Sequence, residues 1–538
     1  MPSTPTTKSQ VQAYRFVLRR MQSALVRKDA VMLHDPMRTH TRATVVGICL
    51  GAIGLIGFLI VGLLSPSPKP PDKDGIIIAQ PSGAVYVLLN GTPKGQVLIP
   101  TFNLTSARLL LLSRSSPEAQ GVGSQVEEGE TPVSAVPAPT FVADEKLEGI
   151  ARERMAGIPD APQLLPEKDE QRISDHWAVC DEYQLDRSLN DPSSQDKIET
   201  TVLGGMPELG PELGDKAALL VEAPTKKVYL VYRTPSSANR PNTSTVRAEV
   251  DMTNDRVVDA LNLDRNNVRK ITVGLLNAIP EAAALRSPEI PGRGGESSAG
   301  IAGLKVGDVL EVERAGELVY YVVLRDGVQQ IKKTTADLIR FTQSRQTDIP
   351  RIAPDQLPGQ VLRDAVEEKD FPEVVPEVLT PTNFPVVCLG WAVVGEGPNA
   401  QGQTKVHVGQ TLPVPVNATG EPGVVDITSP NADGGKIEHF YMPPGKAAVV
   451  RGSVSPADFT TGPIYLISDR GVKYGIPDAR TAGALGLSKQ SPAPDAIVRL
   501  LPNGASLNAR DVLQTFDSVP VGDGVFTEQA KPQEQPVP

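Results

Sequence analysis

The chain has little of the material from which catalytic and metal sites are usually built. Its 538 residues include three cysteines and five histidines, and aromatic residues make up only 4%. No cysteine has a companion at C-x-x-C spacing, and no phosphate-binding loop, G-x-S-x-G or H-E-x-x-H sequence occurs. The sequence therefore predicts no catalytic residue, no metal ligand and no bound cofactor, and it leaves enzymatic activity open. The three histidines after residue 65, for which we expect structural roles, are His176, His407 and His439.

An excess of positive charge is also missing from the chain as a whole. Its net charge is −10, which argues against nucleic acid as a partner, because phosphate binding needs clustered cations. The charge is nevertheless divided. Residues 1–42 hold eight basic and two acidic residues, a net charge of +6, so the remaining residues carry −16. This division suggests that the two parts lie in different compartments.

One long apolar run explains such a division. Residues 43–64 contain no charged side chain, and as a helix these 22 residues rise by ~33 Å, enough to cross a bilayer. A cleaved signal peptide is the alternative, but 42 residues precede the run and no A-x-A site follows it. We therefore predict a single-pass anchor in the inner (plasma) membrane. The basic segment before it predicts a cytosolic N-terminus, with the bulk of the chain outside.

The segments beside this anchor have distinct patterns. Residues 9–33 carry apolar side chains at helical spacing among several arginines, which predicts a basic amphipathic helix that lies on membrane lipid or against a partner protein. The Pro-rich stretch 65–75 is expected to be a stiff linker. The final residues, 521–538, have no apolar pattern and are expected to be disordered.

The cysteines divide in the same way. Cys49 lies inside the anchor, whereas Cys180 and Cys388 lie in the larger part. Outside the cytosol such a pair indicates one disulfide, and two buried free thiols are the alternative.

The larger part has a repeating pattern in which a tyrosine precedes an apolar strand. Many prolines and glycines, 50 and 47 respectively, favour short strands and turns over long helices. Helix-like pieces follow several of the tyrosine strands, and residues 500–513 resemble residues 271–286. We therefore predict a β-rich α+β domain over 76–520, with four degenerate repeats around a central region. The repeats are expected near 76–113, 225–290, 300–345 and 460–515.

Several motifs together resemble the EccB family, a membrane component of type VII (ESX) secretion systems in mycobacteria and related actinobacteria. They occur in order along nearly the whole chain, and NLTSARL is the most recognisable. The matching segments are YRFVLRRMQSALVRKDAVMLHDPMR (14–38), NLTSARL (103–109), GIPDAP (157–162), WAVCD (177–181), CLGW (388–391), YLISDRGVKYGI (465–476) and RLLPNGASLNARDVL (499–513). The motif residues are Asn103, Leu104, Thr105, Ser106, Ala107, Arg108 and Leu109. Two departures are Asp160, where the family usually has glycine, and the unusual approach to NLTSARL at 90–102.

The resemblance implies an elongated periplasmic domain of four repeats around a β-rich core. It also implies assembly into a hexameric complex with the EccC, EccD and EccE subunits, contacts between subunits outside the membrane, and a disulfide between Cys180 and Cys388. A structural role in this secretion complex is the first expectation. A membrane-anchored extracytoplasmic ATPase or other hydrolase of the same system is the alternative, since some family members are described as ATPases. A cell-wall binding module is a third possibility, which the few aromatic residues disfavour.

Overall fold

The computed structural model describes residues 7–27, 36–64, 73–115, 136–193, 197–234, 245–343, 346–357, 360–368, 370–429 and 437–518. The expected linker 65–75 lies largely outside these residues, and the expected disordered tail 521–538 lies entirely outside them. The chain divides into two compact units, Met1–Lys69 and Pro70–Pro538.

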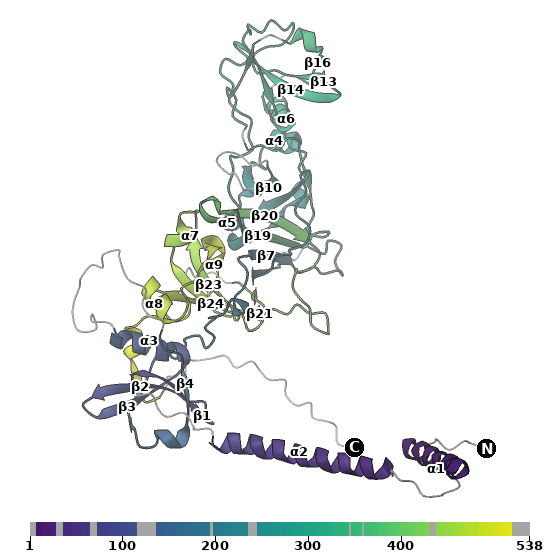
Figure 1. Cartoon of the computed structure of the whole chain (residues 1–538). Coiled ribbons are helices and arrows are strands. Elements are labelled where there is room, and N and C mark those ends of the chain that lie inside the picture. Colours follow the sequence, from purple (N-terminus) through teal and green to yellow (C-terminus); the bar gives the residue numbers. More distant parts are fainter. Residues whose placement is uncertain are drawn as a thin grey trace, which may run out of the picture. The chain divides into compact units, whose positions relative to one another are not determined.

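The first unit consists of two helices, α1 (Lys8–Arg27) and α2 (Pro36–Leu64). Pro36 is the first residue of α2, a position where the missing N–H costs nothing because no carbonyl of the same helix is available to it. The portion Thr41–Val61 of α2 is long and apolar enough to cross a membrane. Both helices are drawn in purple in Figure 1.

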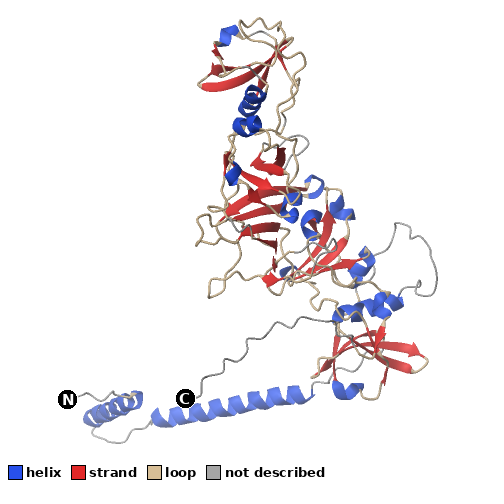
Figure 2. Ribbon diagram, turned by 180° about the vertical axis from the view of Figure 1, so that it is seen from behind, coloured by secondary structure: helices blue, strands red, loops and turns tan. Residues whose placement is uncertain are grey.

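The second unit is rich in β-strands, which are drawn in red in Figure 2. Four of its sheets share one topology. In each, three strands form an antiparallel meander, a helix follows, and a fourth strand pairs in parallel with the first. In repeat 1 these elements are β1 (Gly75–Gln80), β2 (Val85–Thr92), β3 (Gly95–Thr101), α3 (Leu104–Ser115) and β4 (Thr140–Ala143). In repeat 2 they are β9 (Ala217–Glu222), β10 (Val228–Arg233), β11 (Thr245–Val250), α4 (Asp255–Ala260) and β12 (Arg269–Lys270).

Repeats 3 and 4 follow the same plan. In repeat 3 the elements are β13 (Val309–Arg314), β14 (Glu317–Leu324), β15 (Gly327–Ile331), α6 (Lys333–Thr342) and β16 (Arg351–Ile352). In repeat 4 they are β23 (Ala447–Ser453), β24 (Ile464–Ser468), β25 (Lys473–Ile476), α8 (Ala479–Ala484) and β26 (Ser491–Pro494). The helix covers the meander, as α6 does against β13 and β14 in Figure 1. The predicted fold class is therefore confirmed: the protein is a mixed, sheet-rich chain with one apolar helix near its N-terminus.

After the fourth strand of each repeat, the chain comes back to the same sheet. There, a further short segment pairs in parallel with the third strand of that repeat. In repeat 1 these segments are β5 (Ala151–Arg152) and β6 (Met155–Ala156), and in repeat 3 the segment is β17 (Val361–Leu362). In repeats 2 and 4 the return is a single bridge, from Glu281 to Arg247 and from Asn503 to Lys473. The similarity between 271–286 and 500–513 falls on these two equivalent returns.

The repeats pack in pairs through their helices. Helix α3 contacts α8, so repeats 1 and 4 share an apolar core, and α4 contacts α6 in the same way between repeats 2 and 3. The short helices α5 (Val273–Ala278) and α9 (Asp495–Val498), which follow the fourth strands of repeats 2 and 4, also touch each other. Another short helix, α7 (Asp458–Thr461), precedes strand β24.

A further sheet lies between the repeats in the sequence and forms the largest core. Its strands are, in spatial order, β20 (Gln401–Gly409), β19 (Val386–Val394), β7 (Trp177–Tyr183), β8 (Ile198–Gly204), β22 (His439–Tyr441) and β21 (Val425–Asp426). Trp177 is almost fully buried in this core, where strands of the sheet meet repeats 2 and 4. Two more pairings tie distant segments together: β18 (Glu377–Val378) joins β9, and β27 (Thr515–Phe516) joins β6.

Candidate functional site

The NLTSARL motif forms the start of helix α3. Asn103 precedes the helix, and its side-chain Oδ1 accepts a hydrogen bond of 2.8 Å from the backbone N–H of Ser106. This bond satisfies one of the free N–H groups at a helix start, which is the usual function of asparagine at that position. The side-chain Nδ2 of Asn103 donates to the carbonyl of Ile158 at 3.0 Å. One residue therefore both begins the helix and binds a second segment.

That second segment is GIPDAP, the other family-like motif. The backbone N–H of Ile158 donates to Ser106 Oγ at 2.9 Å, and the Thr105 hydroxyl donates to the carbonyl of Pro162. Thr105 and Ser106 are fully buried, so these bonds are shielded from water. Asp160, the departure from the family pattern, lies on the exposed turn of this segment. The substitution therefore leaves the buried bonds untouched.

Arg108 extends this motif to repeat 4. Its guanidinium donates to the carbonyl of Leu485 at 2.8 Å and forms an ion pair with Glu167. Leu485 ends helix α8, where unpaired carbonyls and the helix dipole favour a cation. Only 5% of the Arg108 surface is exposed. The motif therefore joins α3, the GIPDAP segment and α8.

The sequence indicated that this motif is distinctive but not what it binds. The remaining members Ala107 and Leu109 are fully buried in the core that repeats 1 and 4 share, and Leu104 packs against it. The unusual approach at 90–102 forms the end of β2 and strand β3, a hairpin that leads directly into α3. The residues of the motif thus make structural contacts, and none of them lines the groove beside Lys332 or the cavity beside Tyr183.

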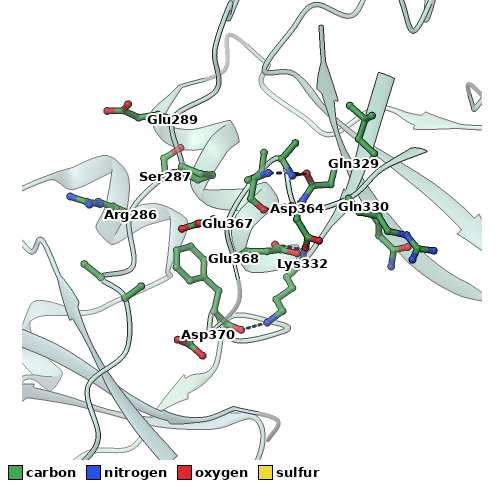
Figure 3. A pocket seen from close by; sticks show the side chains of 18 of the residues that line it. Arg286, Ser287, Glu289, Gln329, Gln330, Lys332, Asp364, Glu367, Glu368 and Asp370 are labelled. Carbon is green, nitrogen blue, oxygen red and sulfur yellow. Dashed lines mark hydrogen bonds between the residues drawn. The ribbon is translucent and has the colours of Figure 1, made fainter. Parts of the chain in front are cut away.

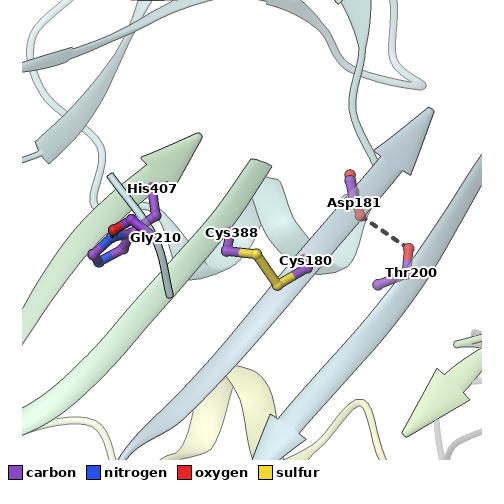
Figure 4. The surroundings of a disulfide bond; sticks show 6 residues. All are labelled: Cys180, Asp181, Thr200, Gly210, Cys388 and His407. Carbon is purple, nitrogen blue, oxygen red and sulfur yellow. Dashed lines mark hydrogen bonds between the residues drawn. A yellow bond between two sulfur atoms is a disulfide. The ribbon is translucent and has the colours of Figure 1, made fainter. Parts of the chain in front are cut away.

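Cys180 and Cys388 form a disulfide within the central sheet. They are directly opposite each other on the neighbouring antiparallel strands β7 and β19, and both are buried (Figure 4). Leu203 and Tyr441 pack around the bond. Cys49, in α2, is a free cysteine.

Next to the disulfide, Asp181 occupies a buried polar position that sequence reasoning missed. Its carboxylate accepts bonds from the Thr200 hydroxyl at 2.9 Å and from the backbone N–H of Thr272 at 2.8 Å. Burial nevertheless raises the pKa of Asp181 above its ordinary value, because the bonds and the charge of Arg269 only partly offset the loss of water. Arg269 donates to the carbonyls of Phe384 and Pro385, and burial lowers its pKa to about 10.

The three described histidines after residue 65 lie apart and form no common site. His407 contacts the carbonyl of Gly210 through Nδ1 at 2.9 Å, and His439 lies between Asp426 and Glu199. His176 contacts Ser174. Among the residues that the structure describes, no group of three His, Cys, Asp or Glu side chains could hold a metal ion.

A groove of about 1220 Å³ separates the two chain segments that connect repeats 2 and 3 (Figure 3). Its basic side chains are Arg286, Lys332 and Arg363, and its acidic ones are Glu289, Asp364, Glu367, Glu368 and Asp370. The Lys332 ammonium already donates to the carbonyl of Phe371 at 2.6 Å. Burial raises the pKa of Glu368, while its carboxylate accepts a bond from the backbone N–H of Lys332. A net acidic lining is unfavourable for the phosphates of a nucleotide.

Comparison with known proteins decides the family. The family model described as type VII secretion system ESX-1, transport TM domain B, matches residues 3–521. The chain belongs to the EccB family. An EccB1 of Mycolicibacterium smegmatis (strain MKD8), named an ESX-1 secretion system ATPase, is 28% identical over 96% of this chain and 96% of its own length. An EccB3 of Mycolicibacterium smegmatis (strain ATCC 700084 / mc(2)155), named an ESX-3 secretion system ATPase, is 29% identical over 95% and 91%.

Solved EccB-like structures share the fold. A chain in a structure of an intact ESX-5 inner membrane complex matches with a TM-score of 0.65 and 24% identity, covering 99% of both chains. A structure of an EccB3 dimer from the ESX-3 core complex matches with a TM-score of 0.62 and 25% identity, covering 82% of this chain and 100% of that one.

Proposed function

We propose that this EccB-family chain is a structural subunit of an ESX-type secretion complex in the inner membrane. The family match extends across the basic helix, the apolar helix and the sheet domain. Similar chains occur in structures of ESX-5 inner membrane and ESX-3 core complexes. The proposed partners are EccC, EccD and EccE, with further copies of this chain in a hexamer whose EccB subunits touch outside the membrane.

The proposed topology follows from charge and length. Helix α2 spans the membrane once, and the positive segment before it keeps the N-terminus in the cytosol. The domain from residue 76 to 520 then lies in the periplasmic space. A disulfide persists more readily there than in the reducing cytosol.

One observation supports the structural role most strongly: the polar side chains of the NLTSARL motif bind other segments of the same domain. Asn103, Ser106 and Arg108 bind the GIPDAP segment and helix α8, and all three side chains are buried. In an enzyme we expect the distinctive polar residues to converge on a cavity. Here they hold repeats 1 and 4 together, so that the second unit presents a fixed surface to neighbouring subunits.

The test is to purify the full-length chain, tagged at one end, from its native membranes in mild detergent. We expect a large assembly in which mass spectrometry identifies EccC, EccD and EccE. Recovery of the chain without these subunits, under conditions in which EccC and EccD still purify together, would contradict the proposal.

The names of the relatives favour one second candidate, an extracytoplasmic ATPase. This candidate predicts that the purified full chain hydrolyses ATP and that one point substitution removes the activity without unfolding the domain. Lys332 and Arg286 in the acidic groove are the basic residues to replace first. Hydrolysis that no substitution changes would indicate a contaminating enzyme.

A further inference from the structure

Helix α1 exposes a continuous apolar stripe. Its members are Val11, Tyr14, Leu18, Met21 and Leu25, which recur every three or four residues and therefore share one face of the helix. Each is more than one third exposed, and Leu25 is 81% exposed. Among the described residues, this face is not covered by any other part of the chain.

The other face of α1 carries charge of one sign only. The helix contains the basic residues Lys8, Arg15, Arg19, Arg20 and Arg27 and no acidic residue. At about 100° per residue, the apolar stripe covers an arc of roughly 80° with Val11 at one edge. Arg15 and Arg19 lie beyond that edge, about 40° and 80° around the helix from Val11. Arg20 lies on the opposite side. Cations beside an apolar stripe are typical of helices that lie in the interface of an anionic bilayer.

A short connection keeps α1 near the membrane. Eight residues, 28–35, separate the end of α1 from the start of α2. Even fully extended, they span only about 30 Å. If α2 crosses the bilayer, as proposed above, anionic headgroups lie within reach of α1 whether or not any partner subunit has assembled.

We propose that α1 binds the surface of an anionic phospholipid bilayer, with its apolar stripe at the acyl boundary and Arg15 and Arg19 on lipid phosphates. This inference rests on the proposed membrane span. A protein partner for the same face is the competing explanation. Lipid is favoured because the helix carries only cations, which match anionic headgroups, and because the short connection to α2 keeps it within reach of the bilayer before any partner has assembled.

The test places a fluorescent label on the full chain in lipid nanodiscs. Labels are attached at Leu18→Cys on the stripe and at Gln12→Cys, about 120° away around the helix, in a Cys49→Ala background. The disulfide cysteines are buried and are not expected to react. The discs contain phosphatidylcholine alone or an equimolar mixture with phosphatidylglycerol, together with a lipid-borne quencher near the headgroups.

We expect quenching at Leu18 to exceed that at Gln12 by about twofold in the anionic discs and to fall in phosphatidylcholine alone. The pair Arg15→Gln and Arg19→Gln should lower this quenching by about half. As a matched pair of single variants, Arg20→Gln, which removes one charge from the far side, should lower it by less than Arg15→Gln. Equal quenching in both lipids, or at both positions, would overturn the proposal. Quenching that is absent until EccC, EccD or EccE is added would replace lipid with a protein partner.

A separate label distinguishes this outcome from failure of the membrane span. Native Cys49 lies within the apolar part of α2, so its label should be shielded from aqueous quenchers in both lipids. If Cys49 is shielded and Leu18 is not quenched, only the inference on α1 fails. If Cys49 is open to water, the proposed span fails.

Discussion

Gly157 lies directly against Ser106, and the space between them admits no side chain. A Cβ atom at Gly157 would stand 2.6 Å from Ser106 Cβ, and the residue has a φ of +133°, which side-chain-bearing residues rarely adopt. The next residue, Ile158, donates its N–H to Ser106 Oγ at 2.9 Å. The two motifs therefore depend on each other: serine supplies the acceptor, and glycine permits the approach.

Replacement of this glycine should separate the two motifs. We predict that Gly157→Ala lowers the free energy of unfolding by about 2–4 kcal/mol, from backbone strain and overpacking together. Gly210→Ala is the matched control, because Gly210 also has a positive φ, of +82°, but has no atom within 4 Å of the added Cβ. That variant should lose only about 1–2 kcal/mol. Equal losses in chemical denaturation would show that the Ser106 contact contributes nothing.

Arg108 is expected to need its guanidinium and not only its charge. Lysine can reach either the Leu485 carbonyl or Glu167 but cannot match the forked geometry, so Arg108→Lys should cost about 1–3 kcal/mol of stability. In repeats 2 and 3, the exposed Arg256 contacts the carbonyl of Thr342, near the end of α6, at 3.4 Å. Arg256→Lys should therefore cost at most about 0.5 kcal/mol. If Arg256→Lys lost more stability than Arg108→Lys, the structural role assigned to Arg108 would be wrong.

Asp181 should give the domain a distinctive dependence on pH. Because burial raises its pKa above 3.8, the stability linked to its proton is complete below that value and is lost as the pH rises through the folded-state pKa. Asp181→Asn, which does not titrate, should remove this loss when unfolding is compared at about pH 4 and about pH 7.

Asp458 provides a control of opposite sign. Hydrogen bonds from the backbone N–H groups of Ser455 and Val454 lower its pKa, so its contribution to stability is present above 3.8 and is lost as the pH falls through the folded-state pKa. Asp458→Asn should therefore change the pH dependence in the opposite direction. The same direction for both variants would contradict the assigned shifts.

The disulfide should stabilise the sheet domain strongly. It closes a separation of 208 residues, for which chain entropy gives roughly 5 kcal/mol. We predict a comparable loss for the double variant Cys180→Ala and Cys388→Ala, measured by thermal unfolding of the purified full chain. Cys49→Ala, which removes the free thiol in α2, should leave the unfolding of the sheet domain unchanged.

Local sequence patterns predicted local structure well. The segment NLTSARL begins a helix, and the tyrosines of YLISDRGVKYGI lie on the antiparallel strands β24 and β25. The first strands of repeats 2 and 4, β9 and β23, begin at Ala217 and Ala447. They precede the indicated ranges 225–290 and 460–515, because the tyrosines that marked these ranges, Tyr229 and Tyr465, lie on the second strands, β10 and β24.

The contacts that define the candidate site could not be predicted from such patterns. Ser106 and Ile158 are 52 residues apart, and Arg108 and Leu485 are 377 apart. A pairing over such distances depends on how sheets pack, which periodicity does not encode. The burial of Asp181 was similarly hidden, since acidic residues are plentiful in the chain and its two threonine partners come from different elements.

The proposed function depends on a topology in which α2 crosses the membrane and the sheet domain lies outside it. Protease protection in spheroplasts, with one epitope at each end of the full chain, measures this topology. External protease should remove the C-terminal epitope and leave the N-terminal one until the membrane is opened. Protection of the C-terminal epitope, with loss of the N-terminal one, would contradict this topology.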